Sequence, residues 1–446
     1  MPRCEGDSSS REPPLIDTGG HSSNNVDTVS LTLRSSLVRY RHLLLLIPLL
    51  TGMVAVLGPP GGVACAIPSV VSPLQGVNRP EPVPVTSTLV IPVELLRESW
   101  EQYKQRFIQE DGRVVDRKAR GISTSEGQSY ALMRAVWMGD RQTFDRVLKW
   151  TGDNLQAGSR SDRLFCWKWG QRADGSWGVI DRTAASDADQ LIALALIRAH
   201  GQWAEKAYLE QATALLNDIW EKETVELKGV RYLLPGDWDF NAEPIRLNPS
   251  YYLPFAYRVF DRVDPNRGWR RLVDSSYTVL NACLSHVGLP ADWCFLDPGL
   301  GTLSLNTDLY DRSSDSGYEA FRVYWNLAAD YRWHGEKRAL ELLGKADWLR
   351  RYFAVRRDLP AVVTVDGIPR ESHEYPGQYG AYLPALALMD DLHANLLYRQ
   401  KIEPSYHSGL WGEPDDYYQQ NWMWFGLALQ AEAARGQPSA SSSDPR

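Results

Sequence analysis

The chain has 446 residues, of which 43% are apolar and 23% charged, and its formal net charge is −7. This composition indicates a globular protein with a substantial core, and the lack of a basic stripe excludes a typical nucleic-acid-binding protein. The aromatic residues are unusual, because 17 Trp and 21 Tyr stand against only 10 Phe. Trp and Tyr join a flat apolar face to a polar group, so they suit a surface that binds partly polar rings as well as a core.

The first 90 residues have the pattern of an export segment followed by a linker. Residues 1–66 combine a polar start, which we expect to be disordered, with a basic flank, a short apolar run and a small-x-small end at Ala66. This order is typical of a signal peptide cleaved after Ala66. An uncleaved membrane anchor is the second interpretation, since the run is shorter than the roughly 20 residues of a spanning helix. Residues 67–90 are Pro-rich and predict a stiff linker, so we expect a periplasmic or secreted protein.

Residues 91–434 have a uniformly helical pattern, and residues 435–446 form a polar tail that we expect to be disordered. Apolar residues recur at helical spacing in twelve segments, whereas convincing alternating strands are almost absent. The segments are 93–109, 126–139, 141–156, 187–200, 203–221, 249–262, 268–286, 317–333, 335–353, 378–392, 393–402 and 416–434. The sequence therefore predicts one all-α domain of six helical hairpins.

Three long insertions, 157–186, 222–248 and 287–316, interrupt the helical pattern and are rich in Gly, Asp and Trp. On an all-α scaffold such insertions are expected to build a cleft. Several Trp on polar loops predict a stacking surface for sugar rings. The indoles concerned are Trp167, Trp169, Trp177, Trp238 and Trp293, together with Trp411 before the last helix.

The five cysteines have neither CxxC nor Cys/His metal spacing, so we expect no structural metal. Cys283 and Cys294 can in principle pair, but spacing does not fix the geometry of a disulfide. We therefore do not expect a bridge from the spacing alone. No metal or other cofactor is expected.

Glu126 stands in the first turn of a predicted helix that continues through Tyr130. Ser125 and Gln128 have the spacing of a capping box. The simplest interpretation of Glu126 alone is that it complements the positive end of the helix dipole.

Acids mark two further helix starts. Ser186 and Asp189 have capping-box spacing, which leaves Asp187 unexplained. A metal-binding Asp-x-Asp pair of a glycosyltransferase is an alternative, but no parallel strands or Gly-rich phosphate loop accompany it. Glu319 and Arg322 share a helix face and can be only a surface pair of small energetic value.

Two carboxyl groups at such helix starts, near aromatic loops, fit the hydrolysis of a glycosidic bond. One carboxyl group must be protonated to assist the leaving oxygen and the other ionised, so their environments must separate their pKa values. We interpret Glu126 as the protonated acid in an aromatic pocket and Glu319 as the carboxylate, charged beside Arg322.

Five motifs follow the order found in family 8 glycoside hydrolases, which are inverting endoglucanases with an (α/α)6 barrel, and the chain resembles this family over about residues 97–430. The motifs are Ser125-Glu126-Gly127-x-x-Tyr130, Ser186-Asp187-Ala188-Asp189, Asn248-Pro249-Ser250-Tyr251, Pro290-x-Asp292-Trp293 and Tyr318-Glu319-x-x-Arg322. More narrowly, Leu155-x-x-Gly158-Ser159 and Arg322-Val323-Tyr324 are similar to the branch encoded with bacterial cellulose synthase.

The resemblance implies an endo-β-1,4-glucanase acting on cellulose-like chains, with Glu126 as general acid and Asp187 bonded to the sugar at the cleavage site. It further implies that Arg322 orients the second carboxylate. The residues expected to bind substrate are Trp167, Trp169, Tyr251, Arg322, Tyr130, Trp238 and Trp293. The family usually has Asp as general base where this chain has Glu319, and a misplacement of about 1 Å can be costly. Asp315 is therefore the reserve candidate for the base.

Other functions stay open at this point. The same scaffold can cut xylan, mixed-linkage glucan or chitosan. The change at Glu319 can instead mark a weakly active glucan-binding protein of an export complex. A cellulose synthase complex is the implied partner, and contact with a membrane is expected only through the N-terminal segment.

Overall fold

The computed structural model describes residues 88–238, 242–308 and 310–434, all within the compact unit Arg79–Arg446. The predicted signal peptide, most of the linker and the tail at 435–446 lie outside the described residues, as does the unit Met1–Asn78. Within the described ranges, no helix is long and apolar enough to cross a membrane.

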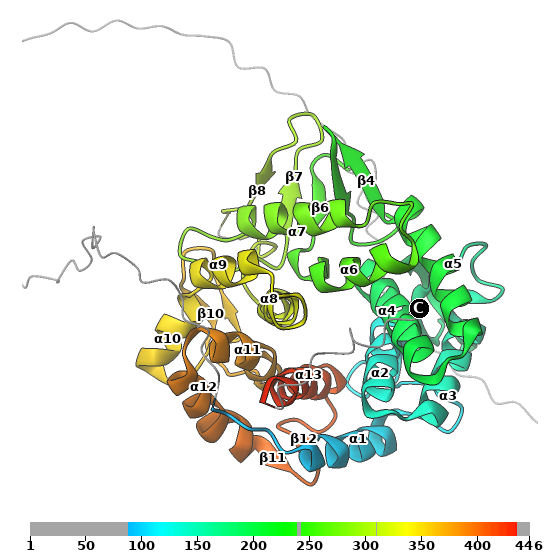
Figure 1. Cartoon of the computed structure of the whole chain (residues 1–446), viewed down its shortest axis with the longest axis horizontal. Helices are drawn as coiled ribbons and strands as arrows, with labels where there is room; N and C mark the ends of the chain where they lie inside the picture. Colours follow the sequence, from blue (N-terminus) through cyan, green and yellow to red (C-terminus); the bar gives the residue numbers. More distant parts are fainter. Residues whose placement is uncertain (1–87, 239–241, 309, 435–446) are drawn as a thin grey trace, which may run out of the picture. The chain divides into compact units, whose positions relative to one another are not determined.

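The described residues form thirteen α-helices arranged as two concentric rings (Figure 1). The inner ring contains α2 (Ser125–Met138), α4 (Ser186–Trp203), α6 (Pro254–Val263), α8 (Phe321–His334), α11 (Pro376–Met389) and α13 (Tyr417–Ala434). The outer ring contains α1 (Val93–Phe107), α3 (Arg141–Thr151), α5 (Lys206–Lys222), α7 (Arg270–Ala282), α9 (Lys337–Lys345), α10 (Trp348–Arg356) and α12 (Asp391–Leu397). Each inner helix contacts the next, and α13 closes the ring on α2. This arrangement is the predicted (α/α)6 barrel.

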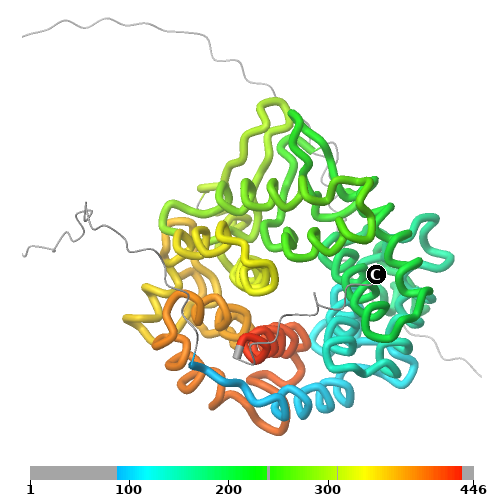
Figure 2. Tube along the Cα trace, viewed as in Figure 1, coloured from blue at the N-terminus to red at the C-terminus, as the bar shows by residue number. Residues whose placement is uncertain are grey.

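The first and last helices of the described chain join the two ends of the ring. Figure 2 shows α1 and α13 side by side, and the indole of Trp424 donates a 3.0 Å hydrogen bond to the carbonyl oxygen of Leu96. Most inner helices are apolar on nearly all sides, because they pack on both neighbours and on the outer ring. Their side chains form one continuous core.

Two glycines allow α11 and α13 to pack at very short range. A Cβ atom on Gly426 would clash with the carbonyl oxygen of Gly380, and a Cβ atom on Gly380 would clash with the backbone of Met423. Neither glycine has a positive φ. The requirement at both positions is therefore for space and not for a special backbone conformation.

The helical predictions are largely confirmed, with one segment wrong. Residues 335–353 form two helices, α9 and α10, instead of one. The break at Ala346 and Asp347 lies against the backbone of Gly288, whose carbonyl oxygen accepts a 3.4 Å hydrogen bond from the N–H of Trp348. A contact with a residue so distant in sequence leaves no signal in the local apolar pattern.

The prediction that strands are almost absent is also wrong. Twelve short strands form five small antiparallel sheets in the described residues. The three-stranded sheets are β1 (Ser123–Thr124), β2 (Cys166–Gln171) and β3 (Trp177–Ala184), and β6 (Ile245–Leu247), β7 (Cys294–Leu296) and β8 (Leu303–Ser304). The pairs are β4 (Thr224–Leu227) with β5 (Val230–Leu233), β9 (Val362–Val363) with β10 (Pro369–Glu371), and β11 (Tyr406–His407) with β12 (Leu410–Trp411). Most of these strands are too short for an alternating pattern to stand out.

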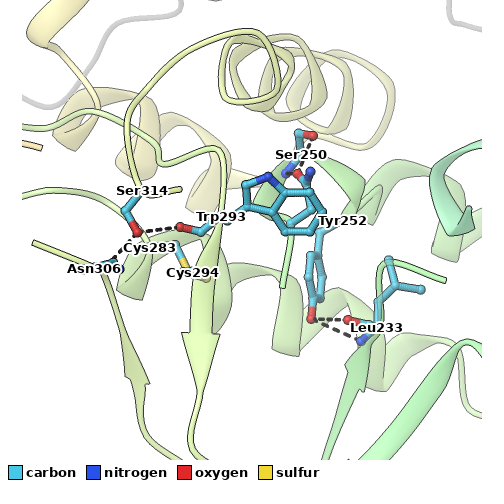
Figure 3. The surroundings of a disulfide bond; sticks show 9 residues. Leu233, Ser250, Tyr252, Cys283, Trp293, Cys294, Asn306 and Ser314 are labelled. Carbon is cyan, nitrogen blue, oxygen red and sulfur yellow. Dashed lines mark hydrogen bonds between the residues drawn. A yellow bond between two sulfur atoms is a disulfide. The ribbon is translucent and has the colours of Figure 1, made fainter. Parts of the chain in front are cut away.

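A disulfide anchors one of these sheets. Cys283 at the end of α7 is bonded to Cys294 in β7, with an S–S distance of 2.04 Å and a Cα–Cα distance of 5.8 Å, a pairing that the spacing of the cysteines had left open. Figure 3 shows Trp293 beside the bridge, and this residue directly precedes β7 in the chain. The free thiol of Cys166 is buried. The disulfide thus ties the strand that follows Trp293 to the barrel.

We predict that Gly426→Ala lowers the free energy of unfolding by about 1–3 kcal/mol, because the added methyl group forces α11 and α13 apart. Urea unfolding followed by circular dichroism measures the effect. The matched control is Gly344→Ala in α9, where a Cβ atom meets no other atom within 4 Å. This control should be neutral or stabilising, since Ala has the higher helix propensity. Equal effects of the two substitutions would contradict the close-packing explanation.

Candidate active site

Arg322, in the first turn of α8, brings three acidic side chains together. The residue is 2% exposed. Its Nη1 atom lies 2.9 Å from Oδ2 of Asp187 and 3.5 Å from Oε2 of Glu126, and its Nη2 atom forms an ion pair with Oε2 of Glu319. The structure therefore unites the acids that the sequence singled out at the beginnings of α2, α4 and α8.

The start of α2 differs from the predicted capping box. Thr124 is the N-cap, and its hydroxyl oxygen accepts a 3.0 Å hydrogen bond from the N–H of Gly127. The buried hydroxyl of Ser125 has no hydrogen-bond partner among the described residues. Gln128 points away from the cap, and its Oε1 atom accepts a 2.6 Å hydrogen bond from the N–H of Val114. The prediction was one residue out because Thr124 is extended in β1, where its side chain can reach back to the helix.

Glu126 has an unusual environment for a carboxyl group. Burial, and next the negative charge of Asp187, raise its pKa to about 7. Arg322 and the hydroxyl groups of Tyr417 and Tyr130 act in the opposite direction. The hydroxyl of Tyr417 donates a 2.7 Å hydrogen bond to Oε1 of Glu126. A protonated and an ionised form of Glu126 are therefore both available near neutral pH.

Asp187 and Asp189 have separate partners. Oδ2 of Asp187 accepts from Arg322, whereas Oδ1 of Asp189 accepts a 3.1 Å hydrogen bond from the N–H of Phe165. Ser186 donates to a backbone carbonyl group in the 222–248 insertion at 2.6 Å, so the predicted capping box with Asp189 is wrong. Since the two aspartates are engaged by different groups, the metal-pair interpretation loses its geometric basis.

Glu319 lies in the turn that precedes α8. Its Oε2 atom accepts hydrogen bonds from Nδ2 of Asn248 at 3.0 Å and from the hydroxyl of Ser250 at 3.4 Å, in addition to the Arg322 ion pair. Asn248 and Ser250 belong to the short turn that leads into α6. Donors from two separate elements therefore converge on one oxygen of this carboxylate.

The reserve candidate Asp315 occupies a different environment. It is 4% exposed and forms an ion pair with Arg370, whose Nε atom lies 2.5 Å from its Oδ2 atom. Arg312 lies 3.7 Å from the same oxygen. The carboxylate of Asp315 is thus paired with two arginines. Asp315 is also not among the residues that line the cleft described next.

A cleft of about 730 Å³ contains both Glu126 and Glu319 in its wall. Four tyrosines supply its aromatic surface, namely Tyr318, Tyr375, Tyr417 and Tyr418. The sequence analysis did not single out these tyrosines as site residues. The sequence did contain a signal for two of them. Tyr417 and Tyr418 stand at the start of the last predicted helix, and the candidate acids also stand at predicted helix starts.

The predicted indoles occupy separate regions beside the barrel. Trp169 and Trp177 lie next to each other on the first three-stranded sheet, with ring centroids 5.4 Å apart and ring planes tilted by 31°. The guanidinium group of Arg113 lies 4.5 Å and 4.9 Å from these rings. Trp177 is 50% exposed and can receive a flat ligand. Trp167 is only partly buried and lies against the side chain of Lys168.

A second aromatic row leads outward from Arg322. Tyr251 lies 5.1 Å from the guanidinium carbon of Arg322, and its ring is 6.3 Å from that of Trp293. Arg246 lies between Trp293 and Trp238, at 5.5 Å and 5.2 Å. These contacts join the second and third insertions beside the three acids.

Two predicted aromatic residues are internal. Trp411 is 1% exposed and belongs to the core, so its expected place on a stacking surface is wrong. Tyr130 is fully buried, and its hydroxyl accepts hydrogen bonds from Arg322 at 3.3 Å and from Trp422 at 3.2 Å. Tyr130 therefore binds Arg322 from inside the core and does not line the cleft.

Comparison with known proteins identifies relatives along most of the chain. The sequence pattern described as "Glycosyl hydrolases family 8" matches residues 85–431. An endoglucanase of Pseudomonas fluorescens is 38% identical over 234 residues, which cover 50% of this chain and 58% of that protein. An endoglucanase of Escherichia coli K12 is 36% identical over 229 residues, covering 51% of this chain and 60% of that protein. The alignments thus span less than two thirds of these relatives.

Solved structures with the same fold extend the match. The endo-1,4-D-glucanase of Vibrio fischeri has a TM-score of 0.62 and 30% identity, and the match covers 74% of this chain and 93% of that chain. The endo-β-1,4-glucanase CMCax of Acetobacter xylinum has a TM-score of 0.61 and 24% identity, over 78% of this chain and 99% of that chain. The second match shows a shared fold.

We predict that Tyr417→Phe raises the pKa of Glu126 further above its value of about 7, because the carboxylate loses the hydrogen bond that stabilises its charged form. Carbon NMR of protein labelled at the glutamate carboxyl groups measures the titration. The control is Tyr418→Phe, since the hydroxyl of Tyr418 donates to the carbonyl oxygen of Tyr318 instead. An unchanged or lowered pKa in Tyr417→Phe would contradict this role.

Proposed function

Because the chain belongs to family 8 of the glycosyl hydrolases, we propose that it is an inverting endo-β-1,4-glucanase that cuts cellulose-like chains. The observation that carries this proposal is the pairing of Glu126 and Glu319, which line one cleft and contact the same guanidinium group. Inverting glycosidases use two carboxyl groups separated by roughly 6.5–9.5 Å, with a water molecule between one of them and the sugar. The names of the relatives reported above, two endoglucanases and an endo-1,4-D-glucanase, support the β-1,4-glucan substrate.

In the proposed reaction Glu126 is the general acid. Its raised pKa keeps a substantial protonated fraction near neutral pH, so it can give a proton to the glycosidic oxygen as the bond to the anomeric carbon breaks. The hydroxyl of Tyr417 then stabilises the carboxylate that remains. Asp187 contributes by raising the pKa of Glu126, and its exposure of only 5% restricts direct contact with the sugar.

Glu319 is the proposed general base. Asn248, Ser250 and Arg322 all bind its Oε2 atom, and hydrogen bonds of this kind favour the ionised form of a carboxyl group. The carboxylate takes a proton from the attacking water, whose oxygen forms the new bond to the anomeric carbon on the face opposite the leaving group. Asp315 is the weaker choice, because two arginines engage its carboxylate.

We propose that the glucan lies against the exposed and partly buried aromatic surfaces near this centre. Trp177 with Trp169 and Trp293 with Trp238 present indoles beside the barrel, and tyrosines line the cleft itself. Flat aromatic faces suit the apolar faces of sugar rings, while hydroxyl groups and guanidinium groups suit their rims.

We predict that Glu126→Gln and Glu319→Ala each lower kcat on a soluble β-1,4-glucan by about 10²–10⁴-fold, the usual contribution of general acid–base catalysis. Release of reducing ends measures the rate, and NMR of the first products should detect the inverted anomer. Asp315→Asn is the matched control and should retain most of the activity. An active Glu126→Gln enzyme would refute the mechanism.

The same assay distinguishes the two candidates for the base. Glu319→Asp should keep or raise turnover, because a carboxylate remains within reach of the water. An active Glu319→Ala enzyme together with an inactive Asp315→Asn enzyme would transfer the role to Asp315. Parallel assays on xylan, mixed-linkage glucan and chitosan test the substrate. Tight cello-oligosaccharide binding by the wild-type protein without product formation would favour a glucan-binding protein instead.

We also propose that the protein works outside the cytoplasm, on glucan that a cellulose synthase complex exports. The Cys283–Cys294 disulfide supports this location, because such bonds persist mainly in oxidising compartments. We expect periplasmic or secreted protein to resist thiol alkylation at both positions, as measured by mass spectrometry. Active protein found only in the cytoplasm with both thiols free would contradict the proposal. A neighbouring cellulose synthase gene would support the pathway.

A further inference from the structure

We propose that Asp292 is a positioning residue that holds the turn carrying Glu319 at the edge of the cleft. This inference rests on the proposed function, in which Glu319 accepts a proton from water. Asp292 does not supply a proton in this scheme. It acts through the backbone that carries the base.

A single carboxylate oxygen of Asp292 binds most of this turn. Its Oδ1 atom accepts hydrogen bonds from the backbone N–H groups of Gly317 at 2.9 Å, Glu319 at 3.1 Å and Ala320 at 2.8 Å. These N–H groups belong to the turn just before α8 and lie outside the helix. Like the first donors of a helix, they need an acceptor from elsewhere in the chain. Here the cap comes from the 287–316 insertion.

The absence of a side chain at Gly317 leaves room for this contact. A Cβ atom at this position would lie only 2.8 Å from Oδ2 of Asp292, so any larger residue would push the carboxylate away from the turn. The two segments are also joined by backbone hydrogen bonds. The N–H of Asp292 donates to the carbonyl oxygen of Asp315 at 2.8 Å, and that of Trp293 to Ser313 at 2.9 Å.

The contact with Asp292 holds the backbone of Glu319, which the partners of its side chain do not contact. Asn248 and Ser250 hold the carboxylate end of the side chain from the turn before α6, while Asp292 holds the backbone end. A long side chain is placed accurately only when both ends are held, and a displacement of about 1 Å can cost about 10²-fold in rate.

The local charges are consistent with an ionised Asp292 at neutral pH. Burial raises its pKa to about 6, while the backbone N–H groups and the positive charge of Arg322 oppose this shift and Asp315 adds to it. A charged carboxylate is also the stronger acceptor for backbone N–H groups. The position of Asp292 and its negative charge thus both favour its hydrogen bonds to the backbone of this turn.

Kinetics of three variants at pH 7 test the proposal. Asp292→Ala should lower kcat on a soluble β-1,4-glucan by about 100-fold while KM stays within about twofold, since the sugar contacts are intact and the base is displaced. Asp292→Asn should recover at least about tenfold of this loss, because its amide oxygen can accept from the same N–H groups. It should still remain below the wild type, since the charge-assisted bonds are lost.

The matched control is Asp297→Ala. Oδ1 of Asp297 also caps backbone N–H groups, those of Gly299 at 2.8 Å and Leu300 at 2.9 Å, but in the loop between β7 and β8. Its kcat should stay within about twofold of the wild type, a loss far smaller than the one expected for Asp292→Ala. An equal loss in this control would mean that any loosened loop in the insertion impairs the enzyme, which would overturn the proposal.

Hydrogen exchange supplies a readout that does not depend on activity. The amide protons of Gly317, Glu319 and Ala320 should exchange faster in Asp292→Ala and at the wild-type rate in Asp297→Ala. Unchanged exchange, an unchanged kcat, or an Asn variant no better than the Ala variant would each overturn the role of Asp292. If Asp292→Ala does not fold, a wild-type kcat in Asp292→Asn overturns it. An inactive wild type with faster exchange in Asp292→Ala would instead refute the proposed function alone.

Discussion

The buried guanidinium group of Arg322 is the interaction on which the site depends. It contacts Glu126, Asp187 and Glu319, and a buried cation of this kind is tolerated only when opposite charges and hydrogen bonds compensate the loss of water. The barrel provides that compensation because α2, α4 and α8 all begin at the same end of the inner ring. Acids at these helix starts also meet the positive ends of the helix dipoles. The fold therefore concentrates carboxyl groups and balances them with one cation.

Arg322 contacts the carboxyl groups of both Glu126 and Glu319, which have different surroundings. Glu126 is partly buried near Asp187 and has a pKa of about 7, whereas Glu319 accepts from Asn248 and Ser250 as well as from Arg322. Distinct surroundings are the means by which a pair of acids is divided into a proton donor and a proton acceptor. The asymmetry arises from neighbouring elements, since Tyr417 comes from α13 and Asn248 from the turn before α6.

The insertions support the site from beside the described cleft, whose lining residues all come from other segments, so the expectation that the insertions build its walls is wrong. Each of the three contains short strands, and the first sheet carries the exposed indole of Trp177 next to Trp169. The Cys283–Cys294 disulfide holds the third insertion next to Trp293, and Asp292 of the same insertion holds the turn at Glu319. Long loops on a rigid scaffold commonly carry function, and here covalent and hydrogen bonds remove much of the freedom that such loops usually have.

The sequence by itself determined an all-α domain of helical hairpins, because apolar periodicity is a local property of the order of residues. The barrel followed from the resemblance of its motifs to family 8. The sequence also marked Glu126, Asp187 and Glu319, since each stands at a predicted helix start. Only the tertiary structure decided their environments. The cap at Thr124, the separate partners of Asp189, the burial of Trp411 and the disulfide depend on contacts between segments far apart in the chain. A pKa or a paired cysteine follows from distances in space, and spacing along the chain carries no measure of those distances.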